Sequence, residues 1–126
     1  MKTYTLTKKQ IKLFKEKATE YVYDFWHLSE WDLTFNVTED GGSYASCAAD
    51  GENCMAVIGL SSTWQGLKPT DSSIGRIAFH ESCELLFWEL QVMANKRYVT
   101  EDQITTARHK IITTMENRIY KEIYDA

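Results

Sequence analysis

The most informative segment of the chain is Ile77-Ala-Phe-His-Glu-Ser-Cys-Glu-Leu-Leu-Phe-Trp88, which is apolar apart from one histidine, two glutamates and a serine. Apolar residues face nearly every direction when this segment is wound into a helix, and a helix of that kind is central and largely buried. Ionisable side chains are costly to bury unless they are paired or bind a metal. His80, Glu81 and Glu84 therefore mark this helix as a candidate functional site.

His80 and Glu84 lie four residues apart, so a helix places them one turn apart on the same face. At that spacing an imidazole nitrogen and a carboxylate oxygen can bind one divalent metal ion. Glu81 lies about 100° further round the helix and can act on a water at that ion, as the general base of a His-Glu-x-x-His helix does. The alternative is an internal hydrogen-bonded network of histidine and glutamate without a metal.

A metal ion needs at least a third protein ligand, and the best candidate is His109. It lies at one flank of the apolar stripe of a predicted third helix. If the second and third helices run antiparallel, His109 climbs roughly 13 Å back along the second helix, to the level between His80 and Phe87. The alternative for His109 is a surface or packing role. His27, near the end of the first helix, is not expected to bind metal.

The rest of the chain predicts short strands between helices. A Thr-x-x-Gln capping box at Thr7 opens a helix that runs to about Leu28. The further elements are a strand over Trp31–Val37, a turn over 39–42, strands over Ser43–Ala49 and Asn53–Leu60, a loop over 61–70, a second helix capped by Asp71, Ser72 or Ser73 that runs to about Lys96, and a third helix behind the capping box Thr100–Gln103.

These elements predict one α+β domain over residues 1–126. We expect an N-terminal helix, a small three-stranded and mainly antiparallel sheet, and then two long antiparallel helices, with the helices packed on one face of the sheet. The apolar side of the third helix is formed by Ile104, Ala107, Ile111, Ile112, Met115, Ile119 and Ile123.

A hairpin is predicted around Asp50-Gly51, which is a two-residue turn signal. With that turn Cys47 faces Cys54 across the two strands. Two reduced thiols, a cross-strand disulfide and a metal site are the three interpretations of this pair, and a reducing cytoplasm disfavours the disulfide.

Composition excludes several classes of function. The net charge is −4 at pH 7, so the broad basic surface of a nucleic-acid-binding protein is not expected, and the lysines of the first helix are interpreted as a solvated helix face. No apolar run reaches the roughly 20 residues that span a bilayer. The N-terminus lacks the apolar core of a signal peptide, and three cysteines do not suit a secreted disulfide framework. We therefore expect a cytoplasmic protein.

The order of elements resembles a known family, the small metallopeptidase-like proteins of phages and prophages, of the minimal zincin (SprT-like) kind. The resemblance covers roughly Tyr21 to Tyr120 and is carried by the following segments: Trp31-Asp-Leu33, Ala56-Val-Ile-Gly-Leu60, His80-Glu-Ser-Cys-Glu84, His109-Lys-Ile-Ile112 and Met115-Glu-Asn117.

This resemblance implies a divalent metal, zinc above all, held by His80, Glu84 and His109, with Glu81 as the catalytic base. The departure from the family is Glu84, which replaces the usual second histidine. A carboxylate there can keep zinc, shift the preference toward manganese or iron, or mark a copy that has lost hydrolysis.

Two functions follow as expectations. The first is a metal-dependent hydrolase, a metallopeptidase-like phage protein working in the host cytoplasm, which binds an extended peptide by strand pairing along Ala56–Leu60. The alternative is a catalytically inactive scaffold that binds a host or defence protein. The substrate and the oligomeric state are not set by the sequence.

Overall fold

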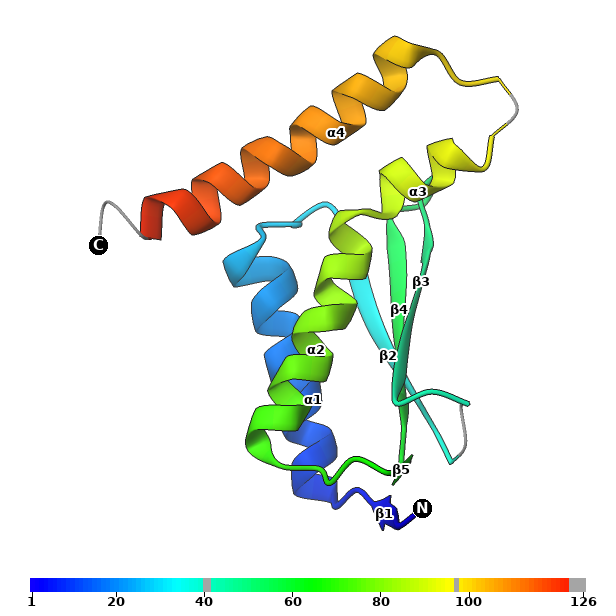
Figure 1. Cartoon of the computed structure of the whole chain (residues 1–126), viewed down its shortest axis with the longest axis vertical. Coiled ribbons are helices and arrows are strands. Elements are labelled where there is room, and N and C mark those ends of the chain that lie inside the picture. Colours follow the sequence, from blue (N-terminus) through cyan, green and yellow to red (C-terminus); the bar gives the residue numbers. More distant parts are fainter. Residues whose placement is uncertain (40–41, 97, 123–126) are drawn as a thin grey trace. The chain divides into compact units, whose positions relative to one another are not determined.

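The computed structural model describes residues 1–39, 42–96 and 98–122 (Figure 1). The chain divides into two compact units, Met1–Leu85 and Leu86–Ala126, and each is described by itself. The predicted α+β class is confirmed. In chain order the elements are β1 (Thr3–Thr5), α1 (Lys8–Thr19), η1 (Glu20–Phe25), β2 (Asp32–Thr38), β3 (Ala45–Asp50), β4 (Met55–Ser61), β5 (Thr63–Gln65), α2 (Asp71–Leu86), α3 (Trp88–Ala94), α4 (Glu101–Met115) and η2 (Glu116–Tyr120).

The first helix begins at the predicted capping box. The Thr7 side chain accepts from the backbone N–H of Gln10, and the Gln10 side chain accepts from the backbone N–H of Thr7. The α-helix passes into a π-helical turn, η1, that ends at Phe25, short of the predicted Leu28. His27 has a φ of 59°, a left-handed conformation that ends the helix, which agrees with its predicted place at the helix end.

The three-stranded sheet has the order β2-β4-β3. Strand β4 is antiparallel to β3 but parallel to β2, so the expectation of antiparallel pairing is wrong for β2. The physical reason is the position of β4. The chain reverses direction from β2 to β3 and again from β3 to β4, and β4 then lies between the other two. Because β4 is central, both its edges are already paired, and the peptide-binding edge predicted at Ala56–Leu60 is wrong.

The hairpin between β3 and β4 is longer than predicted. Asp50 pairs with Met55, so four residues, Gly51–Cys54, form the turn. The Asp50 carboxylate accepts hydrogen bonds from the backbone N–H of Glu52 and Asn53 and from the Asn53 side chain, which stabilises the longer loop. The register shifts accordingly: Cys47 lies opposite Ile58 rather than Cys54, and all three cysteines are free.

A second, two-stranded sheet was not expected. β1 pairs antiparallel with β5. β1 lies before the first predicted helix, and β5 lies in the segment predicted as a loop over 61–70. The turn expected over 39–42 includes residues 40–41, which lie outside the described residues. Gly42, at the end of this turn, has a φ of 74°.

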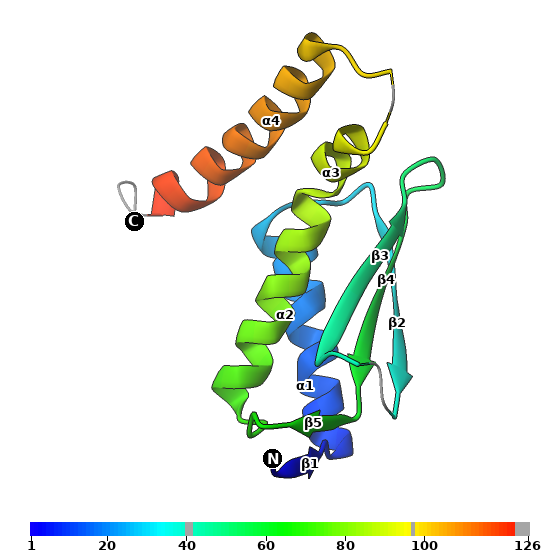
Figure 2. The ribbon, with the colours of Figure 1, turned by 45° about the vertical axis from the view of Figure 1, so that its right-hand side comes forward.

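The core of the first unit lies between the three-stranded sheet and the helices α1 and α2, which cover the same face of it (Figure 2). Its buried residues are Leu6, Phe14, Ala18, Ile58, Leu60, Trp64, Ile74 and Ala78. The prediction that helices pack on one face of the sheet is confirmed for this unit. The opposite face carries exposed residues such as Thr34, Ser46 and Val57.

Helix α2 differs from its prediction at both ends. Thr70, rather than Asp71, Ser72 or Ser73, is the N-cap: its hydroxyl accepts from the backbone N–H of Ser73, whose hydroxyl accepts from the backbone N–H of Thr70. The helix ends at Leu86 instead of continuing to Lys96. Phe87, with φ −90° and ψ 1°, leaves the helical conformation, and α3 follows as a separate helix.

The second unit contains α3, α4 and η2. The capping box at Thr100 and Gln103 is present as predicted. Of the predicted apolar stripe, Ala107 and Ile111 are buried, Ile104, Ile112, Met115 and Ile119 are exposed, and Ile123 lies outside the described residues. An ion pair of 3.5 Å between the Lys110 ammonium and the Glu89 carboxylate joins α4 to α3.

Candidate functional site

Helix α2 brings His80 and Glu84 together as the sequence spacing predicts. The Nε2 atom of His80 lies 3.4 Å from Oε1 of Glu84. Both side chains are solvent-accessible, with exposed fractions of 68% for His80 and 45% for Glu84. The expectation that this whole polar group is buried is therefore wrong. The helix turns these two side chains outward, and solvent reaches them.

Glu81 is the buried member of the group. Only 5% of its surface is exposed, and within the described part of the chain its Oε2 atom has no hydrogen-bond partner. Burial raises the pKa of Glu81 above its ordinary value, the nearby Glu84 carboxylate raises it further, and His80 opposes the shift. A carboxyl group with a raised pKa holds a proton more strongly than an exposed glutamate does, and this favours a role in proton transfer.

A buried hydrogen bond fixes α2 beside Glu81. Trp26 Nε1 donates to Ser82 Oγ over 3.0 Å, and Ser82 Oγ donates to the carbonyl of Phe79 over 2.7 Å. Both Trp26 and Ser82 are buried. Trp26 falls within the helix predicted from Thr7 to about Leu28, but the sequence gives no sign that its indole N–H has a partner on α2.

Two aromatic rings of η1 and the ring of Trp26, which follows η1, contact Phe79, the residue that precedes His80. The ring of Phe79 makes edge contacts with Tyr21 and Phe25, at centroid distances of 5.2 and 6.1 Å, and lies tilted against Trp26 at 5.8 Å. Aromatic pairs at these separations add to the stability of a core. The π-helical turn therefore supports the segment of α2 that carries the candidate site.

Cys47 is a residue of this region that the sequence misplaced. It lies on β3 and packs against the core cluster, with its side chain half-buried. Burial raises the pKa of its thiol to about 12, and the charges of Glu81 and Glu84 contribute to that rise. The thiol therefore stays protonated at neutral pH.

Two donors of this group fit a metal ion. Two ligands bound to zinc at about 2.0–2.1 Å in a tetrahedral arrangement are roughly 3.4 Å apart, and the His80 and Glu84 atoms have that separation. Within residues 1–39, 42–96 and 98–122, no three His, Cys, Asp or Glu side chains are arranged as a metal site. His109 is an exposed residue of α4, in the second unit, and its role as a ligand stays a prediction.

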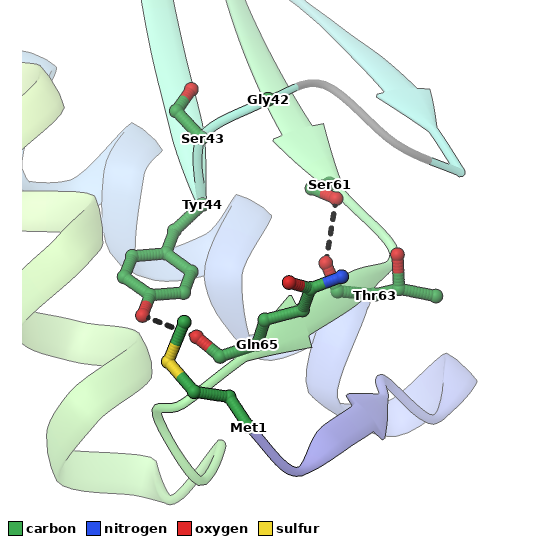
Figure 3. Close-up of a pocket in the computed structure, with 7 residues that line it drawn as sticks. All are labelled: Met1, Gly42, Ser43, Tyr44, Ser61, Thr63 and Gln65. Carbon is green, nitrogen blue, oxygen red and sulfur yellow. Dashed lines mark hydrogen bonds between the residues drawn. The ribbon is translucent and has the colours of Figure 1, made fainter.

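An open pocket of about 550 Å³ lies elsewhere in the first unit, near the N-terminus (Figure 3). It is lined by Met1, Gly42, Ser43, Tyr44, Ser61, Thr63 and Gln65, and no residue of α2 contributes to it. Tyr44 donates its hydroxyl to the Gln65 carbonyl over 2.7 Å, and Ser61 donates to the Thr63 carbonyl over 2.8 Å. These hydroxyl groups are therefore already used within the fold.

Comparisons of the chain with models of known protein families, with curated proteins and with solved structures find no match. Among the helices that the structure describes, none has both the length and the apolar character needed to cross a membrane. The family resemblance and the zinc site accordingly stay predictions.

Proposed function

We propose that this chain is a metal-dependent hydrolase that cleaves peptide bonds, with Glu81 as general base and with His80 and Glu84 among the metal ligands. The observation that supports it is the combination on α2: two donor atoms 3.4 Å apart at the surface, and beside them a buried carboxylate without a partner. A divalent metal ion, when bound, polarises a carbonyl group and makes a water molecule more acidic.

In this proposal Glu81 moves the proton. Its carboxylate accepts a proton from the water that attacks the peptide carbonyl and delivers that proton to the amine that leaves. The raised pKa of Glu81 suits both steps, because the carboxylate then holds the proton more strongly than an exposed glutamate does.

An extended peptide would bind beside α2 along β3 rather than along β4. Among the described strands β3 pairs only with β4, so its other edge has no strand partner. Cys47, in the middle of β3, packs against the core cluster that includes Ala78 of α2, so β3 lies on the side of the sheet that this helix covers. Backbone hydrogen bonds to an edge strand would hold a peptide with little dependence on its sequence.

The test combines elemental analysis with a cleavage assay. We expect one equivalent of metal per chain, and cleavage of an unfolded protein such as casein that falls by about 10²–10⁴-fold in Glu81→Gln. Glu89→Gln, which removes an exposed carboxylate of α3, is the control and should leave cleavage unchanged. Bound metal together with cleavage that does not depend on Glu81 would refute the catalytic role.

A catalytically inactive binding scaffold is the second candidate. The observation that favours it is the contact between His80 and Glu84 themselves, since an exposed pair at this spacing is also a common feature of helix surfaces. That function predicts a folded protein that neither binds metal nor cleaves casein.

A further inference from the structure

We propose that the outer face of the three-stranded sheet binds a partner protein through a basic amphipathic helix. The outer sheet face is the side of β2, β4 and β3 that α1 and α2 do not cover (Figure 2). This inference goes beyond the proposed hydrolase and does not depend on it, because α2 lies on the other side of the sheet.

The strand register arranges the outer sheet face as three rows of residues. Each row takes one residue from β2, one from β4 and one from β3, and the rows are Asp32–Met55–Asp50, Thr34–Val57–Ala48 and Asn36–Gly59–Ser46. All nine are exposed except Gly59, which is half-buried. The exposed fractions of Met55 and Val57 are 47% and 39%. The face therefore has an apolar centre along β4, with a carboxylate on each side of Met55.

The carboxylates of this sheet have no basic residue in the strands to balance them. No Lys or Arg lies between Lys17 and Lys68, and the same interval contains the acidic residues Glu20, Asp24, Glu30, Asp32, Glu39, Asp40, Asp50 and Glu52. The lysines of α1 belong to a helix that covers the opposite face. Within the part of the chain that the structure describes, Asp32 and Asp50 take part in no ion pair. The outer sheet face is therefore complementary in charge to a basic partner.

Asp50 is held in a defined position as an anion. Its carboxylate accepts a hydrogen bond of 2.7 Å from the Asn53 side chain and further bonds from the backbone N–H groups of Glu52 and Asn53. The bond from the Asn53 side chain contributes most to lowering the pKa of Asp50. Because a carboxylate has about four acceptor sites, it can still accept from a lysine or arginine of a partner.

The size of the outer sheet face excludes a second copy of the chain as its partner. Strands lie about 4.8 Å apart and rise about 3.3 Å per residue, so the face measures roughly 14 by 17 Å. A stable protein interface buries about 800 Å² on each partner, which is several times this area. The face therefore fits one short element of a partner.

The spacing of the carboxylates matches an α-helix. Asp32 and Asp50 lie on the two strands that flank β4, so their backbones are about 10 Å apart. Seven residues of an α-helix advance by about 10.5 Å. A helix lying across the strands can therefore direct two basic residues, seven positions apart, at the carboxylates. Its apolar residues between them then contact Met55, whose flexible side chain adapts to different partners.

The experiment measures the fluorescence anisotropy of a labelled helical peptide in the presence of the chain. The probe consists of alanine and glutamine, with two lysines seven residues apart and two leucines between them on the same face. A peptide with glutamates in place of the lysines is the control, and it should not bind. Met55→Lys places a cation between the two carboxylates and should weaken binding of the probe by about 10-fold, because it disturbs two charge contacts and one apolar contact.

Met115→Lys is the matched variant, since it makes the same substitution at an exposed methionine of the second unit and changes the net charge equally. It should leave binding unchanged, and equal weakening by both variants would overturn the proposal. Sedimentation of the unaltered chain as a dimer that Met55→Lys dissociates would assign the face to a second copy instead. If Met55→Lys does not fold, amide NMR spectra of the unaltered chain decide: the probe should shift signals of β2, β3 and β4, and shifts confined to α1 and α2 overturn the proposal.

Discussion

Replacing Glu81 by glutamine should stabilise the folded protein at neutral pH. Only 5% of the surface of Glu81 is exposed, and one of its carboxylate oxygens has no hydrogen-bond partner among the described residues. Burial raises the pKa of Glu81 in the folded state above its ordinary value of 4.5, so the folded chain holds this proton over a pH range in which the unfolded chain has lost it. The free energy of unfolding therefore falls as pH rises from about 4.5 through the folded-state pKa.

The size of the effect follows from the missing partner. A buried polar group without a hydrogen bond costs about 1–3 kcal/mol, and more when it is charged. The glutamine amide is neutral but also needs partners, so we expect a net gain of about 1–2 kcal/mol at pH 7. In urea, where the free energy of unfolding changes by about 1–3 kcal/mol per molar denaturant, the midpoint should rise by roughly 0.5–1 M.

The assay is urea unfolding followed by tryptophan fluorescence at several pH values between 4 and 8. Trp26, Trp31 and Trp64 report on the first unit. The difference between Glu81→Gln and the unaltered chain should be small near pH 4 and grow toward pH 8. Glu84→Gln, which changes an exposed side chain of the same helix, serves as the control and should stay within about 0.5 kcal/mol. A Glu81→Gln variant that is destabilised equally at every pH would refute this reasoning.

Two further predictions concern the packing of the first unit. Phe14→Ala should lower the free energy of unfolding by about 3–5 kcal/mol, because the ring is fully buried, whereas Val57→Ala on the exposed sheet face should cost less than about 1 kcal/mol. Equal losses in urea unfolding would contradict the assigned core. Ser82→Ala should cost about 1–3 kcal/mol by leaving the Trp26 indole N–H unpaired, and a double-mutant cycle with Trp26→Phe should show coupling of about 0.5 kcal/mol or more. Strict additivity would exclude the Trp26–Ser82 bond.

Features that depend on a few neighbouring residues were predictable from the sequence. Both capping boxes, at Thr7 and Thr100, form between residues three apart, so their partners are visible in the chain itself. The contact of His80 with Glu84 is local in the same way. The alternation of Trp31–Val37 placed β2 correctly within one residue at each end.

Features set by distant residues were not predictable. The parallel pairing of β2 with β4 depends on which strand lies in the middle, and no local signal specifies that order. The prediction of a two-residue hairpin turn was wrong because the Asp50 side chain accepts hydrogen bonds within a longer turn, Gly51–Cys54. The break between α2 and α3 at Phe87 could not be predicted, because no glycine or proline lies at this position.

In the candidate site, too, the local features were predictable and the features set by distant residues were not. Sequence spacing gave the pair on the helix surface, but it could not tell that Glu81 is the buried member, because burial depends on how α2 is turned against the sheet. The position of Cys47 was predicted wrongly for a related reason. Its neighbourhood depends on the register of β3 against β4, and a two-residue turn would have moved it opposite Cys54.

Glu81 is the side chain of α2 that the fold explains least. The other buried residues of this helix are apolar or, like Ser82, have hydrogen-bond partners. A leucine or methionine at position 81 would serve the packing without the cost of an unpaired carboxylate. A residue that lowers stability while lying beside two outward donor atoms is typical of a site kept for its chemistry. Urea unfolding of Glu81→Gln therefore measures how much stability the buried carboxylate costs the fold.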